Sequence, residues 1–144
     1  MAGAVGGYVY YQEQEKKSAV ENMPTVSAEI GTGRFTLYAP DSNEGLQRGL
    51  AIFDTLPQDK GMIFRGLPVG VQPFTMRDMK FDIDILWVDK DNVVTHVVYS
   101  ASKDSYPQRF ENPISRPSAY VIELNAGAAD EFGIFPGTPV AITE

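Results

Sequence analysis

The sequence predicts an α+β domain, dominated by a mainly antiparallel sheet of about seven strands that curls into a small barrel and carries two short helices. Three observations support this fold class. Short segments with strand-like patterns recur along the chain, and turn residues separate them. Their hairpin spacing leaves no room for a helix after every strand. With 43% hydrophobic and 11% aromatic residues, the 144-residue chain can bury one core.

The first predicted elements are a strand, a helix and a second strand. Residues 34–39 alternate apolar and polar side chains, which is typical of a half-buried strand. Asp41, followed by Glu44 three residues later, forms a capping-box pattern that predicts the start of a helix. Pro57 and the leucine before it end this helix. Residues 61–64 are short and apolar, and they predict the next strand.

A hairpin and a long loop follow. Residues 80–88 alternate and predict a strand, which reaches a turn of polar residues at 89–92. Residues 93–99 are rich in β-branched side chains and are expected to pair back as the second strand of the hairpin. Residues 101–118 contain three prolines and predict an irregular loop. Loops of this length are often functional or mobile.

The last elements are a strand, a short helix and a final strand. Residues 120–124 predict the strand. Asn125 is expected to cap a helix that runs to Phe132, and Gly133 supplies the left-handed exit. Residues 139–142 predict the final strand after a Pro-Gly turn.

The N-terminal segment is predicted to lie outside the globular domain, which is assigned to residues 32–144. Residues 1–11 contain small residues followed by tyrosines and are too short to span a membrane. They are either a flexible terminus or the remnant of a membrane anchor. The second alternative is considered because tyrosine favours the membrane–water interface. Residues 12–31 are polar and predict a linker. A remnant of an anchor would make the protein membrane-tethered, and we expect the domain to lie outside the cytoplasm.

Composition and charge exclude several functional classes. A net charge of −7 and a pI near 4.6 argue against a nucleic-acid partner, because a phosphate backbone is bound by lysine and arginine. The absence of cysteine excludes disulfides, thiolate nucleophiles, zinc fingers and iron–sulfur clusters. No cofactor is predicted. The sequence does not indicate an oligomeric state.

Three blocks of residues occur in a recognisable order. They are Gly61-Met62-Ile63-Phe64, Phe74-Thr75-Met76-Arg77-Asp78 and Tyr120-Val121-Ile122-Glu123-Leu124. With these blocks, residues 34–143 resemble the family called "domain of unknown function 192". The resemblance implies a small strand-rich α+β fold, often secreted or membrane-tethered, with no established activity. The chain departs from the family pattern at Phe53, Thr75, the Arg77-Asp78 pair and Asp82.

The strand at residues 80–88 and its approach carry the candidate binding site. In a strand, Asp82 and Asp84 project from one face, while Trp87 shares the other with apolar residues. With the long loop as rim, the predicted site residues are Arg77, Asp78, Asp84, Trp87, Tyr106 and Arg109. Carboxylates, arginine and aromatic rings are side chains that can bind a ligand rich in hydroxyl groups. The sequence therefore predicts a non-catalytic binding or accessory domain for a small polar ligand such as a carbohydrate.

Two other functions are considered. Same-face residues on a strand lie about 6.5–7 Å apart, near the carboxylate separation of about 6.5–9.5 Å in inverting glycosidases. Asp84 and Asp82 could thus serve a carboxylate-dependent hydrolase. The other alternative is a structural partner of a membrane complex, held by the N-terminal segment.

No metal site is predicted. Residues 89–92 resemble the start of a calcium loop, but Val94 and Ser100 stand where that loop needs glycine and glutamate. His96 is the only histidine in the chain. Sulfur ligands for copper could come from Met62, Met76 and Met79. Methionines in apolar segments more often fill the core.

Overall fold

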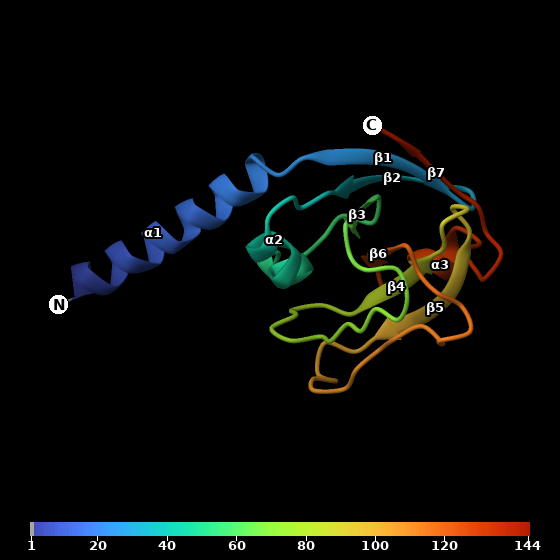
Figure 1. The fold of residues 1–144 in the computed structure, drawn as a ribbon. Helices are drawn as coiled ribbons and strands as arrows, with labels where there is room; N and C mark the ends of the chain where they lie inside the picture. The colour runs from blue at the N-terminus through green and yellow to red at the C-terminus, as the bar shows by residue number, and fades with distance from the viewer. Residues whose placement is uncertain (1) are drawn as a thin grey trace.

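A seven-stranded sheet organises the chain in the order β5-β4-β6-β3-β2-β1-β7, as the computed structural model of residues 2–144 shows (Figure 1). The strands are β1 (Thr25–Ile30), β2 (Gly33–Tyr38), β3 (Lys60–Phe64), β4 (Ile83–Val88), β5 (Val94–Ala101), β6 (Tyr120–Asn125) and β7 (Val140–Thr143). The helical segments are α1 (Ala2–Glu21), α2 (Asn43–Arg48), the 3₁₀ turn η1 (Gly49–Ile52) and α3 (Ala128–Glu131). The predicted α+β class is confirmed.

The sheet is mixed, and not purely antiparallel. β2 and β3 run parallel, whereas the other neighbouring strands pair in antiparallel fashion. A parallel pair needs a crossover connection, and α2 with η1 supplies it between β2 and β3. This single crossover places α2 on the outer face of the sheet, where it borders the cavities described below.

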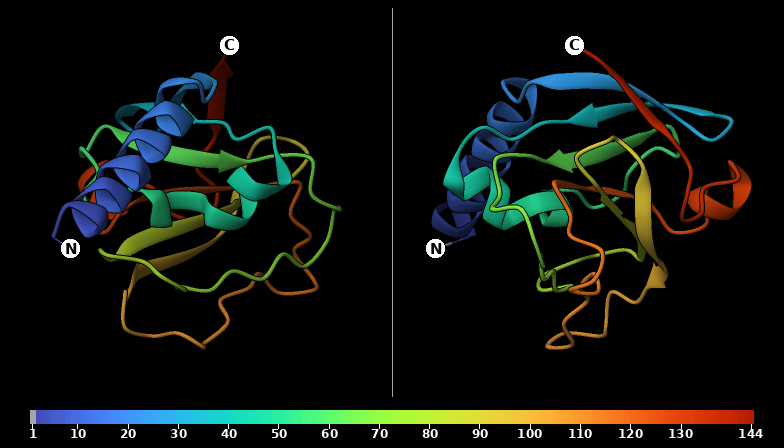
Figure 2. Two further views of the ribbon diagram at one scale, coloured as in Figure 1. Left: turned by 90° about the vertical axis from the view of Figure 1, so that its left-hand side faces the viewer. Right: turned by 45° about the vertical axis from the view of Figure 1, so that its right-hand side comes forward.

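The sheet curls, and its two edge strands meet at one end (Figure 2). An isolated bridge joins Val93, just before β5, to Pro139, just before β7. The Val94 N–H donates to the Thr138 carbonyl at 2.9 Å, and the Val140 N–H donates to the Asn92 carbonyl at 2.8 Å. These contacts close one end of the sheet into a half-barrel and pair backbone groups that edge strands otherwise leave free.

Two apolar cores lie on opposite sides of the sheet. The inner core fills the half-barrel with side chains from all seven strands and from α3. The outer core lies on β3, β4 and β6, under α2, η1 and residues 65–82, which we call the covering segment. Because β3, β4 and β6 are covered on both faces, their side chains are almost all buried.

The predicted linker at residues 12–31 is wrong. Residues 12–21 belong to α1, and Thr25–Ile30 forms β1, which pairs with both β2 and β7. Val26, Ala28 and Ile30 point into the inner core. The exposed residues between them are polar, so the segment has the composition of a linker but the alternation of a strand. The sheet therefore begins N-terminal to residue 32.

Local caps also differ from prediction. Ser42, and not Asp41, caps α2, since its hydroxyl accepts from the Gly45 N–H at 3.0 Å. Asn125 does not cap α3 but donates its side-chain amide to the Leu56 carbonyl. Gly133 does adopt the predicted left-handed conformation, with φ of +66°. The strand predicted from residue 80 begins at Ile83.

α1 extends away from the sheet and from the rest of the domain (Figure 1). Neither α1 nor any other helix in residues 2–144 combines the length and the apolar character needed to cross a membrane. The predicted N-terminal segment includes Met1, which lies outside the described residues.

Candidate functional site

Asp84 occupies the inner side of β4 and is fully buried. One carboxylate oxygen accepts from the Ser100 N–H at 2.8 Å, and the other accepts from the Gly127 and Ala129 N–H groups at 3.1 and 2.9 Å. Burial raises the pKa of Asp84, while these three main-chain donors act in the opposite direction. The carboxylate thus joins β4 to the end of β5 and to the first turn of α3.

Asp82 lies in a different environment from Asp84. It is exposed and precedes β4, and one of its oxygens accepts from the Lys103 N–H at 2.8 Å. The structure therefore places one carboxylate at the surface and the other in the core.

Trp87 lies on the opposite side of β4 from Asp84, within the outer core. Its indole N–H donates to the Gln72 carbonyl at 2.9 Å. The ring packs edge-on against Phe74, with centroids 6.4 Å apart, and contacts His96 at 5.2 Å. The indole is fully buried, so it offers no stacking surface to a ligand.

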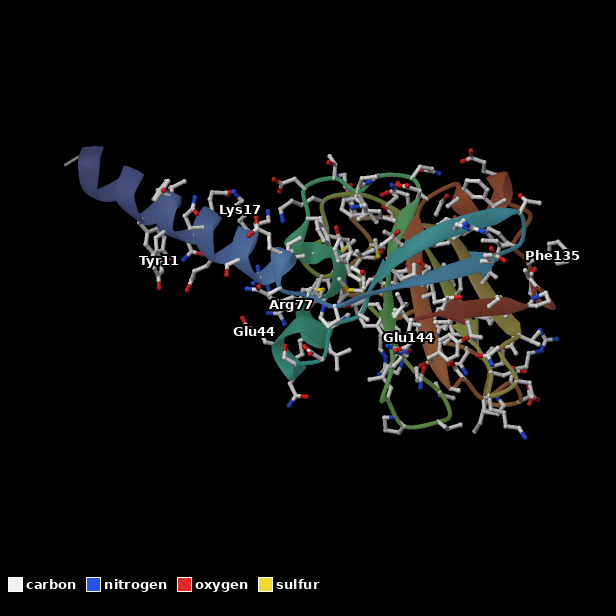
Figure 3. The ribbon with its side chains drawn as sticks, turned by 90° about the horizontal axis from the view of Figure 1, so that it is seen from above. Tyr11, Lys17, Glu44, Arg77, Phe135 and Glu144 are labelled. Carbon is white, nitrogen blue, oxygen red and sulfur yellow. The ribbon has the colours of Figure 1, made fainter. Side chains whose placement is uncertain are left out.

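Arg77 and Asp78 do share a cavity. Their side chains are 73% and 81% exposed, and the Arg77 Nε lies 3.8 Å from the Asp78 carboxylate. Arg77 lies beside α2 (Figure 3). Together they line a cavity of about 480 Å³ with Gln47, Arg48, Ala51 and Lys80. We call this the cationic cavity.

The cations of this cavity come from two separate elements. Arg48 ends α2, while Arg77 and Lys80 belong to the covering segment. The Lys80 ammonium donates to the Ala51 carbonyl at 2.9 Å and lies 3.9 Å from the Asp54 carboxylate. Among the described residues, Arg48 has no ion pair. The cavity therefore concentrates positive charge on an acidic protein.

Tyr106 and Arg109 lie on the long loop between β5 and β6, apart from the residues that line the cationic cavity. The Arg109 guanidinium is 3.6 Å from the Glu111 carboxylate, and Tyr106 is exposed. Phe110, in the same loop, exchanges two backbone hydrogen bonds of 2.8 Å with Phe74. The loop is thus attached to the covering segment of its own domain.

A second cavity, of about 540 Å³, adjoins the first one. It lies between α2 and the covering segment, and we call it the apolar groove. Its lining residues are Asn43, Leu46, Gln47, Phe64, Leu67, Pro68, Val71, Gln72, Pro73, Phe74 and Thr75. Both volumes fall in the range of about 300–1,000 Å³ that is usual for small-molecule sites.

Glu123 is a buried carboxyl that the sequence analysis did not select. It lies in β6 opposite Met62 of β3 and Ile85 of β4, and only 5% of the residue is exposed. No side-chain hydrogen bond or ion pair involves it among the described residues. Burial alone raises the pKa of Glu123 to about 8. The sequence signal for this site was a single acidic residue among apolar neighbours in the strand at residues 120–124.

The described residues contain no group of three histidine, aspartate or glutamate side chains arranged to hold a metal. His96 lies against Trp87 on the outer side of the sheet. Burial lowers the pKa of His96, and the Arg116 charge lowers it further. Met62 and Met76 are both part of the outer core, where they pack as apolar side chains.

A family model described as "Uncharacterized ACR", the domain of unknown function 192, matches residues 26–142. The chain belongs to this family. The match begins within β1 and ends within β7, so it includes the strand that the sequence analysis placed in the linker. The resemblance drawn from the three sequence blocks is confirmed.

Two solved structures share the fold of this family member. One is a proposed transcription regulator from Sinorhizobium meliloti 1021, with 21% identity, a TM-score of 0.76, and coverage of 83% of this chain and 95% of that chain. The other is a protein of unknown function from Novosphingobium aromaticivorans, with 26% identity, a TM-score of 0.66, and coverage of 83% and 84%. A comparison with curated proteins found no match. These structural similarities support the half-barrel fold described above.

Proposed function

We propose that this family member is a non-catalytic binding domain for a small polar ligand that carries a negative charge. The cationic cavity is the observation that supports this function. Arg48, Arg77 and Lys80 surround it, and Asp78 is the only acidic residue in its lining. In a chain of net charge −7, such a local excess of cations is selective for anions.

The chemistry of the lining favours a carboxylate or phosphate group over a neutral sugar. An arginine guanidinium can donate two parallel hydrogen bonds to either anion. A neutral sugar is usually held by an exposed aromatic ring, but Trp87 is buried. A carbohydrate ligand would therefore carry an acidic group.

The carboxylates support the non-catalytic role. A hydrolase needs two carboxylates that face the same substrate. Asp82 is exposed, whereas both oxygens of Asp84 are bonded to main-chain N–H groups inside the protein. These contacts give Asp84 a structural role.

Replacing Arg77 with alanine is expected to weaken anion binding about tenfold, because charge-assisted hydrogen bonds are lost. The probes are inorganic phosphate, glucuronate and glucose, titrated while backbone amide resonances are followed by NMR. Phosphate and glucuronate are expected to shift residues 47–48 and 77–80, and glucose is expected to leave them unchanged.

The matched control is Arg34→Ala. Arg34 is also exposed, but it lies on β2 and pairs with Glu29 at 2.6 Å, outside the cationic cavity. This variant is expected to bind like the unmodified chain. Equal weakening by both substitutions, or no anion-dependent shift at residues 47–48 and 77–80, would contradict the proposed function.

α1 supports a second role, the attachment of the domain within a membrane-associated complex outside the cytoplasm. Tyr8, Tyr10 and Tyr11 are exposed on this helix, which extends away from the sheet (Figure 1). Tyrosine is enriched at membrane–water interfaces. Replacing the three tyrosines with serine is expected to reduce co-sedimentation with phospholipid vesicles several-fold. Unchanged sedimentation would argue against attachment, and protease accessibility in intact cells tests the location.

A further inference from the structure

The cationic cavity and the apolar groove are neighbours along α2. Gln47 lines both of them. α2 also contributes Leu46 to the groove and Arg48 to the cationic cavity. The covering segment does the same, with Thr75 in the groove and Arg77 in the cavity. Gln47 therefore forms a wall that the two cavities share.

We propose that the ligand is an anionic amphiphile, with its carboxylate or phosphate head in the cationic cavity and its alkyl chain in the apolar groove. This inference rests on the proposed function and adds the class of ligand. Charge complementarity sets the orientation of the ligand. The anionic head is attracted to the cationic cavity, and the groove lining contains no charged residue.

The groove is suited to an alkyl chain because most of its lining residues are apolar and the buried polar one, Gln72, is already bonded. Leu46, Phe64, Leu67 and Phe74 supply hydrophobic surface. Gln72 is 4% exposed; its side-chain amide donates to the Pro68 carbonyl at 2.8 Å, and its side-chain oxygen accepts from the Ser118 hydroxyl at 3.1 Å. Gln72 therefore has little capacity left for a polar ligand.

The rim of the groove also favours an apolar occupant. Val71 lines the groove and remains 40% exposed. Covering such a side chain with methylene groups removes apolar surface from water, which is favourable. Val69, two residues earlier, is 71% exposed and is not part of the groove lining. Substituting Val71 therefore tests whether the alkyl chain occupies the groove, and substituting Val69 is the matched control.

The experiment measures the affinity of the full chain for acetate, butanoate, hexanoate and octanoate at pH 7 by isothermal titration calorimetry. Each methylene that enters the groove is expected to tighten binding about fourfold, from the usual transfer free energy of a buried methylene. Octanol has the same chain without the charge and is expected to bind much more weakly than octanoate. Arg77→Ala is expected to weaken octanoate about tenfold.

Two valine variants test the location of the chain. Val71→Ser is expected to weaken octanoate several-fold and leave acetate unchanged, whereas Val69→Ser is expected to change neither. Both positions are exposed, so neither substitution threatens the fold.

The source of the amphiphile is addressed with phosphatidylglycerol vesicles. If octanoate displaces the chain from the vesicles, the site accepts a lipid. If octanoate binds but does not reduce vesicle binding by a chain whose three α1 tyrosines are replaced with serine, the site takes a free amphiphile. Either result supports the amphiphile class.

The possible failures are distinguishable. Binding of phosphate and acetate at the cationic cavity, with no gain from longer chains, would overturn the amphiphile inference and leave the proposed function intact. Equal binding of octanol and octanoate, unaffected by Arg77→Ala, would overturn the assigned head group. No binding by any of these anions would overturn both proposals.

Discussion

Replacing Asp84 with alanine is expected to lower the free energy of unfolding by about 3–5 kcal/mol. The substitution removes the acceptor of the Ser100, Gly127 and Ala129 N–H groups at a fully buried position. A buried donor left without an acceptor costs about 1–3 kcal/mol. Urea denaturation followed by far-ultraviolet circular dichroism measures the change.

Asp82→Ala is the matched control. Asp82 is exposed and accepts one main-chain hydrogen bond, so this variant is expected to lose less than about 1 kcal/mol. If Asp84→Ala kept the stability of the unmodified chain, the role assigned to this residue in joining β4, β5 and α3 would be contradicted.

The strands could largely be predicted because their patterns are local. β2 alternates along six residues, and β3, β5 and β6 are apolar or β-branched segments between turn residues. β1 escaped detection because Thr25, Ser27 and Glu29 give it a polar composition. Its strand character depends on pairing with β2 and β7, and β7 lies at the far end of the sequence.

The sites were harder to predict because they depend on contacts between distant residues. The donors to Asp84 lie at positions 100, 127 and 129, so a spacing pattern around Asp84 could not reveal its buried role. Arg77 was selected from sequence, but Arg48 was not, because only the crossover through α2 brings the two to one cavity. Trp87 was placed on the correct face, yet the covering segment that buries it has no regular pattern.

Glu123 differs from these cases, because its position alone was informative. It stands in a strand whose neighbouring side chains are apolar, and a carboxyl there must either find a partner or take up a proton. The structure shows no partner among the described residues, and burial raises its pKa to about 8. Burial therefore favours the protonated form of this carboxyl at neutral pH.

The stability of the chain is consequently expected to fall as the pH rises from about 4.5 to about 8. In the unfolded state Glu123 ionises near its ordinary value of 4.5, while in the folded state it keeps its proton up to a pKa of about 8. Between these values the folded state binds the extra proton, so each pH unit lowers the free energy of unfolding by about 1.4 kcal/mol, and the full loss approaches about 5 kcal/mol. Above pH 8 the contribution of Glu123 is constant.

Glu123→Gln removes the titration and is expected to flatten this dependence. Its stability should be close to that of the unmodified chain near pH 5 and higher by several kcal/mol at pH 8.5. Taking the difference between the two chains at each pH cancels other groups, including Asp84, whose raised pKa acts in the same direction. Glu131→Gln, at an exposed position in α3, is the control and should leave the dependence unchanged. A difference between the Glu123→Gln variant and the unmodified chain that stays constant from pH 5 to 8.5 would show that Glu123 ionises normally in the fold.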